Sequence, residues 1–322
     1  LYNANGITTN DTSYGTIAGL DTLTSAGFIN YKAIVEKKDA NTIVITIPKD
    51  EKGTPDPDTK ILPEDRENGI NTIKNAGDIV SNAAEGAWKE DHDVDAKFVP
   101  YAIVGGYDLH YNTGSYIDSN DMAANVGLIR RIRRDGAIDT VMPFMEYGKS
   151  HYASFLESGA RGDGRQHYTG AGVLLRRDLT DGRYYEGAVR AGWLSGDFHG
   201  RIADTIARYD SGSPYFAAQA GMGKIYTRNR DTYDVYGKFF YTHLASDSTV
   251  ITSRLGTTRY DFDDVNSYRT RLGMRWTRNF DKVRAFYAGI GWDYEFDSKA
   301  RATFAEYSTA TPTGKGSSGF LE

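Results

Sequence analysis

From Lys97 to the end of the chain, segments in which apolar and polar residues alternate are joined by connections that are long and short in strict turn. Alternation with a period of two predicts β-strands with one apolar and one polar face. The short connections are residues 134–136, 180–182, 228–230 and 279–282, and the long ones are 111–121, 157–165, 198–213, 247–265 and 297–315. Membrane barrels of the outer-membrane type place all short turns at one end and all long loops at the other. The sequence therefore predicts an antiparallel up-and-down transmembrane β-barrel.

We expect nine complete strands, at residues 97–110, 122–134, 137–153, 166–179, 183–197, 214–227, 232–246, 266–279 and 282–297, and a tenth that begins near 316–322. Single-chain bacterial barrels have an even number of strands. We therefore expect that the barrel continues beyond the sequence, and that the sheet as it stands would expose two edges, which is an aggregation liability.

The two faces of each predicted strand differ sharply in polarity. In 282–297, Phe286, Ile290 and Trp292 alternate with Gly291 and Asp293. In a membrane barrel the apolar face meets lipid and the polar face lines the lumen. Glycines at 192, 273, 289 and 291 lie on the polar face, where we expect them to make room for an inserted element. Charges of both signs share that face and can pair there: Glu186, Arg190, Lys238, Arg269, Arg271, Arg275, Asp293 and Glu295.

Residues 63–90 are predicted to form a helix. Pro63 suits its first position, and acidic residues fill the first turn, where the helix dipole favours them. A narrow apolar stripe includes Ile70, Ile73 and Val80, whereas the other faces are polar. About 28 residues at ~1.5 Å each give ~42 Å, enough to cross a bilayer. Such a polar helix can cross only inside a wet channel, where Gly69, Gly77 and Gly86 would allow close approach to the wall; the alternative is a helix packed on a soluble domain.

The first 62 residues are predicted to form two regions. Residues 1–50 are β-like: 31–35 and 42–47 read as a hairpin, and 15–19 and 25–30 resemble short rungs of a parallel β-solenoid. A small hairpin on a neighbouring domain is the alternative. Residues 51–62 read as a charged linker, in which Asp56 and Asp58 lack the Gly and Glu of a calcium loop.

Composition narrows the class of protein. The chain has no Cys, so it has neither a disulfide framework nor a thiolate metal site, and its net charge of −5 argues against a nucleic-acid partner. No run approaches the ~18 apolar residues of a membrane helix. The 23 tyrosines suit the aromatic girdles of a barrel, although a soluble carbohydrate-binding β-protein would also use them. The chain opens on Leu1 without a signal peptide, so we expect a fragment whose beginning lies elsewhere.

Catalytic and cofactor motifs are not found in the sequence. The six histidines form no i, i+4 pair, and there is no G-x-S-x-G elbow. His151, His167, Glu157 and Asp163 surround one long connection and are a weak hydrolase candidate, and residues 161–163 spell the adhesion tripeptide Arg-Gly-Asp. We expect no catalytic residue, no metal site and no cofactor.

The order of a solenoid-like segment, a linker, a polar helix and a barrel resembles the autotransporters of type V secretion. Residues 97–102 and 316–322 look like the first and tenth strands of that family's β-domain. The resemblance implies a twelve-stranded barrel that enters the bacterial outer membrane with the assembly machinery, exports an upstream passenger and is then plugged by the helix. Some members cut themselves at adjacent Asn residues in this helix. Here Asn68, Asn71, Asn75 and Asn82 are never adjacent, so we expect the passenger to stay attached.

The expected function is thus that of an outer-membrane translocator and not of an enzyme. Its partners would be the bilayer, the assembly machinery and its own passenger. The alternatives are a channel or porin, a barrel-borne hydrolase or adhesin, and a secreted soluble β-protein.

Overall fold

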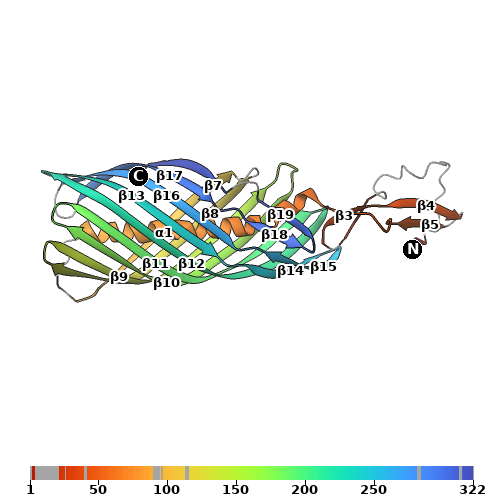
Figure 1. The fold of residues 1–322 in the computed structure, drawn as a ribbon, viewed down its shortest axis with the longest axis horizontal. Helices are drawn as coiled ribbons and strands as arrows, with labels where there is room; N and C mark the ends of the chain where they lie inside the picture. Colours follow the sequence, from red (N-terminus) through yellow and green to blue (C-terminus); the bar gives the residue numbers. More distant parts are fainter. Residues whose placement is uncertain are drawn as a thin grey trace.

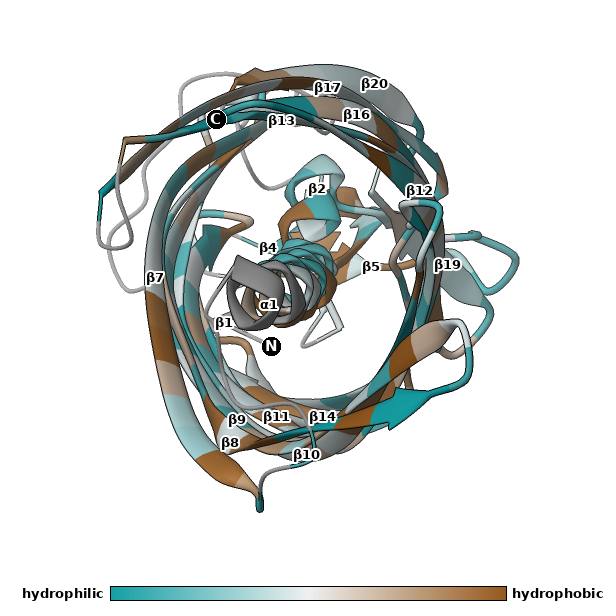
Figure 2. Cartoon of the chain, turned by 90° about the vertical axis from the view of Figure 1, so that its left-hand side faces the viewer, coloured by the Kyte–Doolittle hydropathy of each residue, from teal (hydrophilic) through white to brown (hydrophobic). Residues whose placement is uncertain are grey.

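The computed structural model describes residues 2–3, 22–25, 27–39, 42–89, 95, 97–112, 116–280, 284–311 and 314–321. A curled antiparallel sheet surrounds a single long helix, α1 (Glu64–Lys89), which runs along the axis of the sheet (Figure 1). The view along the axis shows α1 inside the ring of strands (Figure 2). The predicted fold class, an antiparallel β-barrel with one N-terminal lumen helix, is confirmed.

Ten strands form the wall: β7 (Val99–Asn112), β8 (Tyr116–Arg134), β9 (Ala137–Phe155), β10 (Arg161–Leu179), β11 (Arg183–Ile202), β12 (Thr205–Arg228), β13 (Asp231–Leu244), β16 (Val265–Asn279), β17 (Ala285–Asp297) and β20 (Gly316–Leu321). Each pairs antiparallel with its neighbour in this order. Within the described residues, β7 pairs with β8 alone and β20 with β17 alone.

Side chains alternate between the two faces of the wall, as the period of two requires. Met145 and Trp292 on the outer face are 71% and 44% exposed, whereas Glu146 and Lys238 on the inner face are each 5% exposed. The outer face is thus apolar and open, and the polar inner face is covered by α1. In the part of the chain that the structure describes, no helix is both long and apolar enough to cross a bilayer.

The long connections are largely not loops, which corrects the sequence-based prediction. β11 and β12 continue through most of 198–213 and meet at a two-residue turn, Ala203-Asp204. Residues 247–265 fold into the hairpin β14 (Asp247–Ser253) and β15 (Gly256–Phe262), and 297–315 contain the hairpin β18 (Arg301–Phe304) and β19 (Tyr307–Ala310). The alternation of buried and exposed side chains continues there, with Ile202 and Tyr209 buried on the inner face. We call this end of the barrel the hairpin end and the opposite end the short-turn end.

Glycines of the inner wall receive aromatic rings from neighbouring strands. A Cβ on Gly148 would lie 2.2 Å from the ring of Tyr168, and one on Gly273 would lie 2.5 Å from the ring of Tyr236. The same holds for Gly223 with Tyr184 and Gly291 with Phe320, whereas a Cβ on Gly192 would meet the Thr169 carbonyl oxygen and the Tyr215 hydroxyl. We expected such glycines to make room for the helix, and this is wrong for Gly192, Gly273 and Gly291. They make room for side chains of the neighbouring strands. Contacts between a glycine and an aromatic ring on the next strand help to fix the register of the two strands.

The segment before α1 forms short antiparallel pairs at the hairpin end. β4 (Ile34–Asp39) pairs with β5 (Thr42–Thr46), which also pairs with β1 (Tyr2–Asn3). β3 (Ile29–Lys32) pairs with β2 (Thr22–Thr24) and with β6 (Thr54–Pro55), and a 3-10 turn, η2 (Pro57–Ile61), leads into α1. The hairpin predicted over 31–35 and 42–47 is thus present but shifted, because its first strand covers 34–39 and residues 31–32 belong to β3. The described strands pair antiparallel and not as parallel rungs, and residues 15–19 lie outside the described residues.

A hydrophobic cluster closes the hairpin end of the lumen. Phe28, Ile61 and Leu62 of the N-terminal segment are fully buried in it. They pack with side chains of β8, β9, β11, β12, β14, β15 and β18, namely Ile117, Tyr152, Phe198, Ile202, Tyr209, Ile251, Tyr260, Phe262 and Ala302. We call this set the mouth cluster. It joins the N-terminal segment to the wall just above the first turn of α1.

Candidate functional site: a lumen filled by α1

The first turn of α1 is held from several sides of the barrel at once. The Asp65 carboxylate accepts hydrogen bonds from Tyr152 Oη at 2.8 Å, Gln166 Nε2 at 2.6 Å and Ser211 Oγ at 2.9 Å. The next residue, Arg66, donates to Ser213 Oγ at 2.6 Å and to the carbonyl oxygens of Ala245 and Asp263. Glu67 accepts from Ser298 Oγ at 3.0 Å. Three consecutive residues therefore contact partners that range from β9 to the segment after β17.

Below this turn, polar pairs continue down the helix. Asn68 donates to Ser150 Oγ at 3.0 Å and to Gln166 Oε1 at 2.7 Å. Further pairs join Thr72 to Asp121, Asn75 to Tyr111, and Ser81 to Gln219. The polarity of α1 is thus matched by the polarity of the inner wall, which is the condition for burying polar groups at low cost.

The strongest electrostatic contact lies halfway along the helix. Asp78 is 2.6 Å from Arg269 Nη2 and 3.0 Å from Arg271 Nη2. Both arginines also pair with Asp293, at 3.3 and 2.7 Å. Two carboxylates and two guanidinium groups thus form a compact cluster without net charge, which we call the Asp78 cluster. It joins α1 to β16 and β17.

Two further ion pairs flank the helix. Lys74 Nζ is 2.6 Å from Glu295 Oε2, and Glu295 also accepts from Ser267 Oγ at 2.9 Å. On the other side, Arg190 pairs with Glu146 at 3.1 Å and donates through Nη2 to the carbonyl oxygen of Ile73. Arg190 therefore reaches the helix backbone itself.

Glycines in α1 let the wall come close. A Cβ on Gly77 would lie 3.3 Å from Arg190 Nη2, and one on Gly69 would lie 2.6 Å from Leu194 Cδ2. An added side chain at either glycine would require the Arg190 or Leu194 side chain to move. Gly86 belongs to the last turns of α1, and its surroundings lie outside the described residues.

The remaining candidate charges pair within the wall. Glu186 is 2.9 Å from Lys238 Nζ and 3.4 Å from Arg176 Nη1, so β10, β11 and β13 are joined there. The Arg275 guanidinium lies over the ring of Tyr287, 5.5 Å from its centroid. Sequence analysis thus selected side chains that face the lumen but overlooked Asp65, Arg66, Gln166 and Glu146. Two sequence features could have identified these residues. Asp65 and Arg66 lie in the acidic first turn of the predicted helix, and Gln166 and Glu146 lie on the polar face of predicted strands.

The weak hydrolase candidate lies on the outside of the wall. His151, His167 and Asp163 are exposed on the outer face of β9 and β10. Nearby, His110 Nδ1 is 2.6 Å from Asp118, whereas the adjacent Ser119 is buried on the inner face. Residues 161–163 are the start of β10 and not a loop, with the Arg161 guanidinium over the Phe155 ring at 5.0 Å. Within the described residues, no group of three or more His, Asp or Glu side chains could hold a metal ion.

Comparison with known proteins identifies the family. The chain matches the model of the autotransporter beta-domain over residues 103–319. It belongs to this family. Its fold is similar to the β-domain of the Bordetella autotransporter BrkA (15% identity, TM-score 0.54, covering 70% of this chain and 97% of that one). The search also returned the translocator domain of NalP from Neisseria meningitidis (13%, TM-score 0.49, 79% and 97%) and the transport unit of AIDA-I from Escherichia coli (10%, TM-score 0.43, 79% and 96%). Comparison with curated proteins gave no match.

Proposed function

We propose that this autotransporter β-domain, an outer-membrane translocator, rests in a plugged state in which α1 is the stopper and the segment before it has already reached the cell surface. The hairpin end then faces outward and the short-turn end faces the periplasm, in keeping with the orientation of outer-membrane barrels. The observation that carries the proposal is the set of ion pairs between helix and wall, with the Asp78 cluster at its centre.

The ion pairs between α1 and the wall favour a helix held at one depth in the lumen over a segment that can slide. A buried charge that loses its partner costs several kcal/mol, on the order of 3–5. Sliding α1 along the axis by one turn, about 5.4 Å, would separate Asp78 from both arginines and Lys74 from Glu295 together. Leaving the lumen therefore requires breaking these pairs in concert, which holds the helix at one depth.

The proposed module exports a passenger and carries no catalytic group of its own. Its partners are the outer-membrane bilayer, the barrel-assembly machinery during insertion, and the passenger attached before residue 1. Because the asparagines of α1 are not adjacent, we expect no cleavage within the helix. Denaturing gels of cells that make the whole protein should show one product that contains both passenger and barrel; two products cut within residues 64–89 would contradict this.

Pore conductance tests the stopper directly. Reversal of the three inner arginines in R269E/R271E/R275E should repel Asp78, loosen α1 and raise the conductance of single barrels in planar bilayers. The matched control is R177E/R183E/R278E, which reverses three exposed arginines paired with Asp139, Asp181 and Asp231 outside the lumen.

The two triple variants carry the same change of net charge, so only the position of the charge differs between them. We expect the control to conduct like the wild-type barrel. Equal conductance of all three proteins would contradict the proposal. A barrel without residues 64–89 gives the conductance of the fully open pore, with which the conductance of R269E/R271E/R275E is compared.

A further inference from the structure

The outer face of β9 and β10 carries four basic residues near the hairpin end. Lys149 and His151 lie on β9, and Arg165 and His167 lie on β10. His151 is directly opposite Arg165, and Lys149 is directly opposite His167. All four side chains are exposed on the side of the wall that faces away from α1. We call them the basic quartet.

The fixed positive charges of the basic quartet are those of Lys149 and Arg165. Three other outward arginines are paired: Arg177 with Asp139 at 2.6 Å, Arg183 with Asp181 at 2.6 Å and Arg278 with Asp231 at 2.9 Å. Within the described residues, no member of the basic quartet has such an ion pair. The quartet therefore offers an external anion the charges of Lys149 and Arg165, and Asp197 on β11 lies directly opposite Arg165.

The position of the quartet along the strands identifies the kind of anion. On β9, the outward residues between Asp139 and Lys149 are Val141, Pro143, Met145 and Tyr147; on β10, those between His167 and Arg177 are Thr169, Ala171, Val173 and Leu175. Both intervals are ten residues, or ~33 Å at ~3.3 Å per residue. With a strand tilt of about 40° this gives an apolar band ~25 Å tall, the height of the lipid-facing band of outer-membrane barrels. The quartet thus lies at the outer edge of the band, where acyl chains end and lipid headgroups begin.

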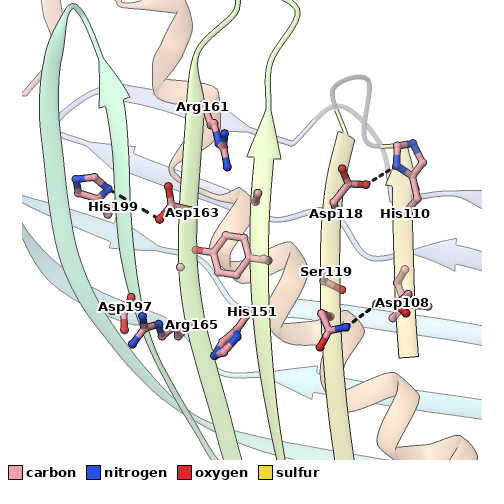
Figure 3. Close-up of a pocket in the computed structure, with 15 residues that line it drawn as sticks. Asp108, His110, Asp118, Ser119, His151, Arg161, Asp163, Arg165, Asp197 and His199 are labelled. Atoms are coloured by element: carbon pink, nitrogen blue, oxygen red, sulfur yellow. Dashed lines mark hydrogen bonds and ion pairs between the residues drawn. The ribbon is translucent and has the colours of Figure 1, made fainter. Parts of the chain in front are cut away.

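A hollow of about 950 Å³ adjoins the quartet, with His151 and Arg165 among the side chains that line it (Figure 3). His151 and Arg165 belong both to the quartet and to the lining of the hollow, which continues over Asp108, His110, Asp118, Asp163, Asp197 and His199. Several of its side chains are held in place, because His110 pairs with Asp118 at 2.6 Å and Tyr116 stacks between His110 and Phe155. Carboxylates and imidazoles form hydrogen bonds with the hydroxyl groups of sugars, whereas Lys149 and Arg165 offer the charge that binds phosphate.

We propose that this surface binds the phosphorylated headgroup of an outer-leaflet glycolipid. The phosphate lies among Lys149, His151, Arg165 and His167, the sugar occupies the adjoining hollow, and the acyl chains lie along the band below, over Tyr147 and Trp193. Of the function proposed above, the inference uses only the orientation of the barrel, with its hairpin end outward; it does not depend on whether α1 plugs the pore.

Lipid retention tests the site. The whole chain is reconstituted in phosphatidylcholine vesicles that contain lipid A as the phosphorylated glycolipid probe, extracted in mild detergent and analysed by native mass spectrometry. Neutralising the site in K149Q/H151Q/R165Q/H167Q should weaken retention of the glycolipid by roughly 30-fold, as expected for the loss of one Lys and one Arg at a lipid surface. The control R130Q/R177Q/R183Q/R228Q removes four basic residues at the short-turn end and should retain lipid A like the wild type. Equal retention by the quartet variant and the wild type, or equal loss in the control, would overturn the proposal.

Thermal unfolding separates a lipid from a free anion. Wild-type protein should unfold at a higher temperature in vesicles with lipid A than in phosphatidylcholine alone, and dephosphorylated lipid A or inorganic phosphate at the same concentration should not reproduce the gain. In phosphatidylcholine alone the quartet variant should be about as stable as the wild type, because it loses no ion pair among the described residues. Equal protection by inorganic phosphate would overturn the assignment to a lipid.

Discussion

At the scale of single residues, Asp78 is one of only two carboxylates in its cluster that balance the charges of two arginines. The other carboxylate is Asp293. The Asn variant of Asp78 would keep the shape of the side chain but leave two guanidinium groups with a single negative partner. Since the cluster is largely shielded from water, the excess charge cannot be screened as it would be on the surface.

We therefore predict that D78N lowers the free energy of unfolding by about 3–5 kcal/mol, measured by denaturant titration of the detergent-solubilised barrel. D139N is the control, because Asp139 pairs with Arg177, whose side chain is 56% exposed, and such pairs contribute about 0–1 kcal/mol. If D78N and D139N lowered the free energy of unfolding by similar amounts, the Asp78 cluster would contribute no more to stability than an exposed ion pair.

Gly148 is a second residue whose role depends on one neighbour. The Tyr168 ring occupies the place where a Cβ would be, at 2.2 Å, so G148A must displace the ring or the backbone. Overpacking of this kind costs about 1–3 kcal/mol. The control is G187A, whose Cβ would meet its nearest atom, the Gln219 carbonyl oxygen, at 3.6 Å. Heat-induced unfolding on semi-native gels should distinguish the two, and an unchanged transition in G148A would contradict the steric explanation.

At the scale of elements, β11 and β12 are joined at the hairpin end by a turn of two residues. Ala203 and Asp204 have φ angles of 47° and 57°, which describe a two-residue turn of the primed type. Neither residue is favoured there, whereas Asn-Gly is the preferred pair. A203N/D204G should therefore stabilise the hairpin by about 0.5–1 kcal/mol. The Arg201–Asp204 pair that it removes is too exposed to offset this gain.

Hydrogen exchange of residues 198–209 is the measurement for this turn, because it reports local opening. Slower exchange in A203N/D204G is the expected result, and faster exchange would show that the turn needs its native residues. The reversed order, A203G/D204N, keeps the composition and serves as the control.

This turn also shows where the sequence was insufficient. The period of two located the central parts of the strands, and the short turns at 134–136 and 180–182 carried Asp-Gly. Ala203-Asp204 carries no such signal, and charged residues surround it, so the continuation of β11 and β12 read as a loop. The hairpins β14–β15 and β18–β19 were missed for the same reason. A strand outside the apolar band no longer needs an apolar outer face, and the alternation becomes weak.

The site was predictable to a similar extent. Alternation identified Arg190, Arg269, Arg271 and Glu295 as inward-facing, since that depends only on local geometry. Which helix residue each would meet depends on the depth and rotation of α1 in the lumen. No local pattern encodes these two quantities, so the contacts of Asp65 with Gln166 and of Asp78 with Arg269 emerge only from the structure.

At the scale of the whole molecule, the mouth cluster joins the N-terminal segment to the wall. Phe28 is fully buried there, and Tyr260 Oη donates to the carbonyl oxygen of Gly27 at 2.7 Å. Burial raises the pKa of Tyr260 above its ordinary value, so its hydroxyl stays protonated as this donor requires. The segment before the helix is therefore anchored to the hairpins that surround the exit.

We predict that F28A frees this segment without unfolding the barrel. Loss of a buried Phe costs about 3–5 kcal/mol, which exceeds what the remaining contacts of residues 27–32 can replace. Limited proteolysis should cut the variant before residue 62 while the wall resists digestion. The control I34A, at a site 50% exposed on the outlying hairpin, should be cut like the wild type. Loss of the whole barrel in F28A would show instead that the mouth cluster is essential to folding.

The helix that fills the lumen is covalently continuous with everything that precedes it in the chain. On the function proposed above, the plug is part of the same chain as the passenger and cannot open again for a second one. Each barrel would then export one passenger, and the number of passengers displayed on a cell would equal the number of barrels.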